Sequence, residues 1–222
     1  ETTAPAAAAT LLQAEAAGVG NYYLLSLHKL TMPAMRAILD AGEVALDGVI
    51  GPGHVSTIVG TRAWEPLPEE YGVPCSIAGF EPLDLLRAID DLVEMAETGR
   101  PAVRNAYSRS VRPEGNPVAL EMLRRVFVVQ DAEWRGIGTL PASGFALAEP
   151  YAHRDALRAF AVDVPPAEEP AGCRCGDVVR GALEPHECPL FGRACTPARP
   201  VGPCMVSTEG ACAAYYRYRG EA

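Results

Sequence analysis

The chain has 222 residues, a formal net charge of −9 at pH 7 and 49% hydrophobic residues, enough for one large or two modest cores. Its mean hydropathy of +0.05 is too high for a disordered chain, and the acidic balance argues against a nucleic-acid partner, because phosphate binding needs a basic face. No apolar stretch reaches the roughly 18–20 residues of a membrane helix, and no secretory signal is visible. We therefore expect a soluble, cytoplasmic protein without a membrane span.

Helical and strand-like patterns alternate along the first part of the chain. Helices are predicted where apolar residues recur at helical spacing between a capping residue and a glycine, over residues 5–17, 32–41 and 83–97. Strands are predicted for short runs rich in apolar or aromatic residues, over residues 21–27, 46–50 and 73–78. This alternation predicts an α/β fold with a mainly parallel sheet and flanking helices.

Two turns follow predicted strands, Gly-Pro-Gly-His at 51–54 and Gly-Phe-Glu-Pro at 79–82. Ligands bind such sheets at the carboxyl ends of the strands. His54 could therefore orient a ligand or exchange a proton there, or it could be a turn histidine bonded to backbone. Glu81 could line the same cleft together with Glu1, or it could be a first-turn acid favoured by the helix dipole. Cys75, inside an apolar strand, is expected to be a buried small hydrophobe.

The pattern beyond residue 99 is less regular. We predict helices over 116–126 and 151–160, with a turn-rich stretch over 131–146. Residues 163–172 are rich in proline and acids, which favour extended, solvated backbone. We place a domain boundary there, with an α/β domain over 1–165 and a small, loop-rich cysteine domain over 166–222.

Six of the seven cysteines fall after Gly172: Cys173, Cys175, Cys188, Cys195, Cys204 and Cys212. Their intervals do not match the paired C-x-x-C motifs of a zinc ribbon. A thiolate-bound metal or cluster, a set of structural disulfides and a mixture of the two all remain open. We favour the first, because an iron-sulfur cluster takes four thiolates. In an extended C-x-C the side chains point to opposite faces, so we expect different roles for Cys173 and Cys175.

Six short motifs are distributed along the chain. They are Glu1-Thr-Thr-Ala-Pro5, Pro52-Gly-His-Val-Ser56, Gly79-Phe-Glu-Pro82, Trp134-Arg-Gly-Ile-Gly138, Gly172-Cys-Arg-Cys-Gly176 and Cys204-Met-Val-Ser-Thr-Glu-Gly-Ala-Cys212. Together they closely resemble the HypD family of [NiFe]-hydrogenase maturation proteins over essentially the whole chain. The family has two α/β domains and a C-terminal [4Fe-4S] domain. The resemblance implies that this chain lacks the first α/β domain, and with it a Cys-Gly-Thr-His motif whose cysteine holds the iron under assembly.

The resemblance also implies roles for particular residues. It implies four ligands of a [4Fe-4S] cluster, namely Cys173, Cys188, Cys195 and Cys212. Cys175 and Cys204 would form a redox-active pair beside the cluster, an arrangement that looks like ferredoxin-thioredoxin reductase. His54 and Glu81 belong to two of the shared motifs, so we count them among the candidate catalytic residues.

The implied function is a scaffold and electron conduit for assembly of the Fe(CN)2CO group, which the full-length protein would hold transiently. Its implied partners are a HypC-type small chaperone and a HypE-type cyanide donor. We expect a metallocentre assembly factor with redox activity rather than a turnover enzyme. Two alternatives are an iron-sulfur-dependent thiol-disulfide oxidoreductase and an interaction module held together by zinc or disulfides.

Overall fold

The structure is a computed structural model that describes residues 1–161 and 170–219. The chain divides into two compact units, each made of more than one stretch of sequence. Unit 1 comprises Glu1–Arg36, Ala45–Ala132 and Pro141–Ala161, and unit 2 comprises Ala37–Val44, Glu133–Leu140 and Val162–Ala222. Most of the linker predicted over 163–172 lies outside the described residues.

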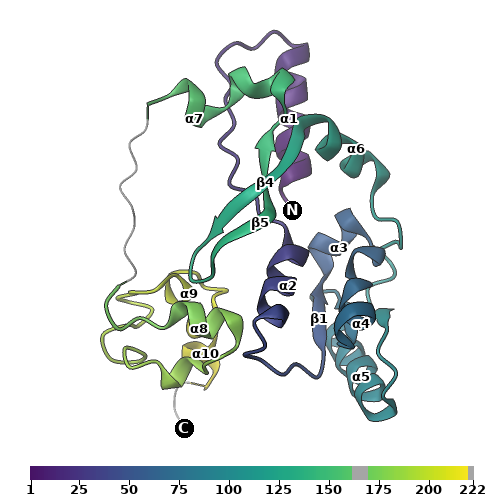
Figure 1. The fold of residues 1–222 in the computed structure, drawn as a ribbon, viewed down its shortest axis with the longest axis vertical. Helices are drawn as coiled ribbons and strands as arrows, with labels where there is room; N and C mark the ends of the chain where they lie inside the picture. Colours follow the sequence, from purple (N-terminus) through teal and green to yellow (C-terminus); the bar gives the residue numbers. More distant parts are fainter. Residues whose placement is uncertain (162–169, 220–222) are drawn as a thin grey trace. The chain divides into compact units, whose positions relative to one another are not determined.

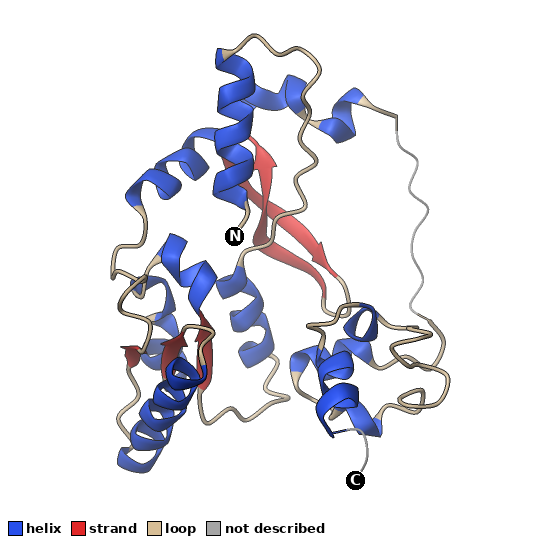
Figure 2. Ribbon diagram, turned by 180° about the vertical axis from the view of Figure 1, so that it is seen from behind, coloured by secondary structure: helices blue, strands red, loops and turns tan. Residues whose placement is uncertain are grey.

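A three-stranded parallel sheet organises one part of unit 1. Its strands, in spatial order, are β1 (Val49–Pro52), β2 (Cys75–Ala78) and β3 (Val103–Asn105). The connection from β1 to β2 contains α3 (Gly53–Val59), η1 (Arg62–Trp64) and α4 (Pro66–Tyr71), and the connection from β2 to β3 is α5 (Pro82–Thr98) (Figure 1). Figure 2 shows α5 in front of the strands. The predicted α/β class with a parallel sheet is confirmed.

The second part of unit 1 is built on two helices, α1 (Ala4–Ala16) and α6 (Pro117–Val126). Ala4, Ala8 and Leu11 lie on one face of α1 because they recur at helical spacing, and they are fully buried against Leu123 and neighbouring apolar residues. The Asn116 side chain accepts hydrogen bonds from two backbone N–H groups at the start of α6. Both helices were predicted, as was α2 (Thr31–Asp40).

The predicted strand over 21–27 is wrong. Only Leu24 forms a bridge, a single pairing with Asp155, and the segment does not join a sheet. Tyr22 and Leu24 pack against the core between α1 and α6, whereas Tyr23, Leu25 and Leu27 are exposed. The alternating pattern therefore reflects an extended segment lying on a core, without a strand ladder beside it.

The turn-rich stretch predicted over 131–146 is also wrong. It lies in a β-hairpin of β4 (Phe127–Trp134) and β5 (Gly138–Leu147). Only Phe127 and Ala132 are buried in β4, so the sequence has no period of two that would indicate a strand. The helix predicted over 151–160 is interrupted. It consists of η2 (Glu149–Arg154) and α7 (Ala156–Ala159), separated by Asp155 in an extended conformation.

Unit 2 consists of short helices joined by loops. These are α8 (Cys175–Arg180), η3 (Pro185–Glu187), α9 (Pro203–Val206) and α10 (Ala211–Arg219). The tip of the β4–β5 hairpin belongs to the same unit. In the described ranges, 1–161 and 170–219, none of the helices combines the length and apolar character needed to cross a membrane.

Candidate functional site

The cysteines that follow Gly172 gather in unit 2. Cys175, Cys195, Cys204 and Cys212 are buried in one cluster with Val178, Met205 and Ala213, and Cys173 packs against that cluster. Cys188, directly after η3, is also buried. Three short helices (α8, α9 and α10) thus supply three thiols to one small unit, and the segments outside the helices supply the other three. We call these six residues the cysteine cluster.

The sulfur atoms of the cysteine cluster contact one another. The Cys204 thiol donates to Cys212 Sγ at 3.1 Å and also shares a hydrogen bond with the side chain of Cys175. The backbone N–H of Cys175 donates to the sulfur of Cys173. Gly202 leaves room for these atoms, because a Cβ there would lie 2.5 Å from Cys173 Sγ and 3.8 Å from Cys204 Sγ.

The Cys173–Cys175 segment does not have the geometry expected from the sequence. Arg174 has φ −112° and ψ 30°, and Cys175 is the first residue of α8. The three residues are therefore not an extended strand, and the prediction that the two cysteine side chains point to opposite faces for that reason is wrong. Helix α8 ends at Arg180 because Gly181 follows it with φ +82°.

Burial affects the acidity of the thiols. Desolvation, followed by the hydrogen bond to Cys212, raises the pKa of Cys204 to about 12. Desolvation also raises the pKa of Cys173 and Cys212, and the neighbouring sulfurs of Cys175, Cys188 and Cys195 raise both pKa values further. A buried group of this kind accommodates several thiolates only beside a compensating positive charge.

The donor set fits an iron-sulfur cluster in its chemistry. Thiolate sulfur is the ligand that such clusters take, four per cluster, and unit 2 supplies six buried or half-buried cysteines. In the described part of the chain, no three cysteine, histidine or acidic side chains are grouped around the position of a single metal ion.

The tip of the β4–β5 hairpin packs against the start of α8. Gly136 has φ +79°, and a Cβ added there would lie 2.6 Å from Gly176 Cα. Arg180 donates from Nη1 to the Gly136 carbonyl (3.4 Å) and from Nη2 to Asp177 Oδ1 (2.7 Å). This contact supports the turn that carries Cys175. The two glycine-containing motifs, at 134–138 and 172–176, are visible in the sequence, but the contact between them is not.

A second group of candidate residues lies at the carboxyl ends of β1 and β2. The exposed rings of His54 and Phe80 lie with their centroids 4.1 Å apart and their planes tilted by 33°. Glu81 forms an ion pair with Arg109 Nη2 at 3.2 Å. His54 and the Phe80-Glu81 turn thus meet at one sheet edge. Glu1 has a different contact, because its carboxylate accepts from the backbone N–H of Thr31 at the start of α2 (2.8 Å).

Residues that the sequence did not indicate hold this edge in place. Asp84 is only 2% exposed and accepts two hydrogen bonds from Arg109, at 2.7 and 2.6 Å. The Arg109 guanidinium holds the pKa of Asp84 below its usual range and lies 4.6 Å from the centre of the Tyr107 ring. Gly53 and Gly79 pack against opposite edges of that ring, where a Cβ would lie 2.9 and 2.7 Å from ring carbons.

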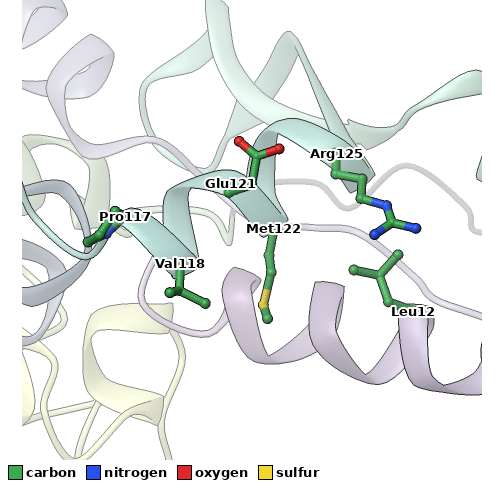
Figure 3. A pocket seen from close by; sticks show the side chains of 6 residues that line it. All are labelled: Leu12, Pro117, Val118, Glu121, Met122 and Arg125. Atoms are coloured by element: carbon green, nitrogen blue, oxygen red, sulfur yellow. The ribbon is translucent and has the colours of Figure 1, made fainter.

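A pocket of ≈ 430 Å³ lies elsewhere, between α1 and α6. Figure 3 shows Met122 pointing toward α1, with Leu12 across from Arg125. Its lining is mostly apolar and includes neither a cysteine nor His54 or Glu81. The pocket is therefore separate from both groups of candidate residues.

Comparisons with known proteins give consistent matches. Residues 1–219 match the HypD family model, described as the hydrogenase formation hypA family. The chain is 46% identical over 224 residues to the hydrogenase expression/formation protein HupD of Azotobacter chroococcum mcd 1 and to the hydrogenase maturation factor HypD of Azotobacter vinelandii, covering 98% of this chain and 59% of each relative. The hydrogenase maturation factor HypD of Cupriavidus necator is 43% identical over 225 residues, with the same coverage. The chain spans about three fifths of the length of these curated relatives.

Proposed function

Because the chain belongs to the HypD family, we propose that it is a hydrogenase maturation factor whose unit 2 binds a [4Fe-4S] cluster. The family membership predicted from six motifs is confirmed by the match over residues 1–219. The observation that carries the proposal is the burial of the cysteine cluster within one small unit. Such a set of soft donors suits iron bound as an iron-sulfur cluster.

Four members of the cysteine cluster would hold the iron-sulfur cluster: Cys173, Cys188, Cys195 and Cys212. This choice follows the motifs shared with the family, because electrostatic range does not separate these four from Cys175, which lies within range of Cys173 and Cys212 as Cys188 and Cys195 do. When bound, the group supplies an electron at a potential set by its surroundings. The protein contributes a buried site and short helices that hold the thiols in place.

Cys175 and Cys204 would form the redox-active pair. Their side chains share a hydrogen bond, so the two sulfurs are neighbours in unit 2. Forming the disulfide releases two protons and two electrons, and reduction takes up the same number. The contact between Cys204 and Cys212 at 3.1 Å makes Cys212 the competing partner, so an experiment must distinguish the two pairings.

The cargo of the factor would be the iron of the Fe(CN)2CO group of [NiFe] hydrogenases. Unit 1 would present His54 and Glu81 to this cargo or to its carriers, a HypC-type chaperone and a HypE-type cyanide donor. The His54 ring is exposed beside Phe80. Glu81, beside Arg109, offers a carboxylate acceptor.

Anaerobic iron and sulfide analysis tests the cluster. We expect about four irons per chain, lost together with the brown colour in Cys188→Ser and in Cys195→Ser. Cys75→Ala is the matched control, because Cys75 is buried in β2 of unit 1, and it should keep the full complement. Full iron and sulfide in both serine variants would refute the ligand assignment, and stoichiometric zinc in the wild type would favour a zinc-stapled module.

The redox pair needs its own experiment. The double variant Cys175→Ser, Cys204→Ser should retain the absorbance of the cluster but lose the pair of thiols that mild oxidation protects from alkylation. Mass spectrometry of the oxidised wild type should then show a Cys175–Cys204 bridge. A Cys204–Cys212 bridge, or loss of iron in the double variant with retention in Cys173→Ser, would contradict the assignment.

The alternative of a thiol-disulfide oxidoreductase draws on the same three contacting thiols. Binding of a HypC-type protein distinguishes the two functions. A maturation factor should form a complex with it, whereas an oxidoreductase should turn over a small disulfide substrate without it.

A further inference from the structure

Helix α5 carries a row of apolar residues on its exposed side. Leu86, Ile89 and Val93 are 63%, 47% and 50% exposed, and the exposed Ala96 continues the row. Their spacing of three, four and three residues is that of the a and d positions of a heptad, which form the seam between two packed helices. We call these four residues the α5 seam.

The opposite side of α5 faces the sheet and carries carboxylates as well as apolar residues. Asp91 accepts a hydrogen bond from Ser76 on β2 (2.8 Å) and one from Arg104 on β3 (3.1 Å). Glu94 also pairs with Arg104, at 2.6 Å, and Asp84 is held by Arg109. Ala88 and Met95 are the apolar residues buried on this side. Ion pairs and hydrogen bonds thus hold α5 against the sheet of unit 1.

This arrangement differs from the usual one in an amphipathic helix. A helix that covers a sheet normally turns its apolar stripe toward the core and its charges toward water. In α5 three carboxylates bind the sheet and its loops on the side that buries Ala88 and Met95, while a second apolar row, Leu86, Ile89 and Val93, faces away. A contiguous exposed apolar stripe of this kind marks an interaction surface. The α5 seam is suited to a second helix, because its residues have the spacing of a helix-packing seam.

The charges beside the α5 seam indicate which helix fits. Asp90 and Glu97 follow Ile89 and Ala96 by one position, so both flank the same edge of the seam. Both are exposed, and neither forms an ion pair with another described residue. A matching helix would place lysine or arginine opposite them, since charges at such flanking positions determine partner choice.

We propose that the α5 seam docks an amphipathic helix of a partner protein, with apolar residues at seam positions and Lys or Arg along the edge that meets Asp90 and Glu97. A second copy of this chain fits poorly. In an antiparallel pair of α5 helices the acids of one copy would face those of the other, and in a parallel pair they would face apolar flanking positions. The proposal is independent of the cysteine cluster and of the proposed function.

Two synthetic peptides test the proposal. Both have leucine at every a and d position over three heptads, and they differ only in carrying lysine or glutamate at the flanking positions. Fluorescence anisotropy with the 222-residue chain should show the lysine peptide binding about tenfold or more tightly than the glutamate peptide. The difference should shrink as salt is added, because salt screens exposed charges.

Variants of the chain distinguish binding at the α5 seam from non-specific hydrophobic binding. Leu86→Asp should weaken lysine-peptide binding by about tenfold or more, whereas Val118→Asp, an equally exposed apolar position on α6, should leave it unchanged. Both side chains are exposed, so neither variant should alter the thermal midpoint by much. The double variant Asp90→Lys, Glu97→Lys should reverse the preference toward the glutamate peptide.

Three results would overturn the proposal. The first is equal affinity for the two peptides, and the second is binding that Leu86→Asp leaves intact. The third is a wild-type dimer in analytical ultracentrifugation that Leu86→Asp dissociates, because the α5 seam would then be covered by a second copy of the chain.

Discussion

Replacing Gly79 by alanine tests the packing that supports His54 and Glu81. A Cβ at this position would overlap Asp84 Oδ2 and lie 2.7 and 2.8 Å from two carbons of the Tyr107 ring. Neither neighbour can yield easily, since Asp84 is held by two hydrogen bonds from Arg109. Overpacking of this kind costs about 1–3 kcal/mol. In a chain of this size, that lowers the thermal midpoint by roughly 2–12 °C.

The assay is thermal unfolding of unit 1 followed by the fluorescence of Trp64, which is 2% exposed. A Trp134→Phe background removes the other tryptophan. Gly20→Ala is the matched control, because nothing lies within 4 Å of a Cβ there and φ is not positive. The iron content should be the same in both variants, since the cysteine cluster belongs to unit 2. Equal midpoints for Gly79→Ala and Gly20→Ala would refute the packing argument.

Three further predictions concern other parts of the chain. Burial raises the pKa of Cys75 from 9.0 to about 12. The protonated thiol therefore adds at most about 4 kcal/mol to the free energy of unfolding, a contribution that is complete below pH 9.0 and is lost as the pH rises toward 12. The free energy of unfolding of Cys75→Ala in urea should depend less on pH above 9 than that of the wild type. The pKa of Asp84 is lowered by Arg109 from 3.8, so this pair stabilises the protein above that pH and ceases to do so as the pH falls through the lowered pKa. Asp84→Asn should therefore destabilise unit 1 in urea unfolding more at pH 7 than at pH 3, and an equal loss at both values would contradict the ion-pair explanation. Gly136→Ala should speed thiol labelling in unit 2 by displacing the hairpin tip from α8, whereas Gly192→Ala, which has a similar positive φ but no neighbour within 4 Å, should have a smaller effect; equal labelling rates would show that backbone strain alone is responsible.

Helix ends were predictable because their signals are local. Gly18, Gly42 and Gly99 follow α1, α2 and α5, and each has φ between +63° and +65°. A glycine adopts this left-handed conformation without the steric cost that a side chain would add, so a glycine after a helical pattern predicts the end of the helix. Strand β2 was also predictable from local sequence, as part of a short, mainly apolar run, and its four residues are all buried, as expected for a strand of a parallel sheet.

Strand pairing was less predictable because it depends on residues far apart in the sequence. β3 has three residues, and Arg104 in its middle belongs there only because Asp91 and Glu94 of α5 lie opposite its guanidinium. The segment around Leu24 has a strand-like pattern but meets only Asp155. β4 lacks the pattern and is nevertheless a strand.

The candidate site was likewise predictable only in part. The number and positions of the cysteines, the turns at 51–54 and 79–82 and the six motifs were readable along the chain, and they were sufficient to predict the family. The contacts were not, because each joins residues that are neighbours only after folding: Cys204 with Cys175 and Cys212, and Gly136 with Gly176. Capping and turn residues act within a few positions of themselves, so the sequence alone determined where α1, α2 and α5 end. Strand pairing, burial and sulfur-to-sulfur contact arise from the whole chain and were decided by the tertiary structure.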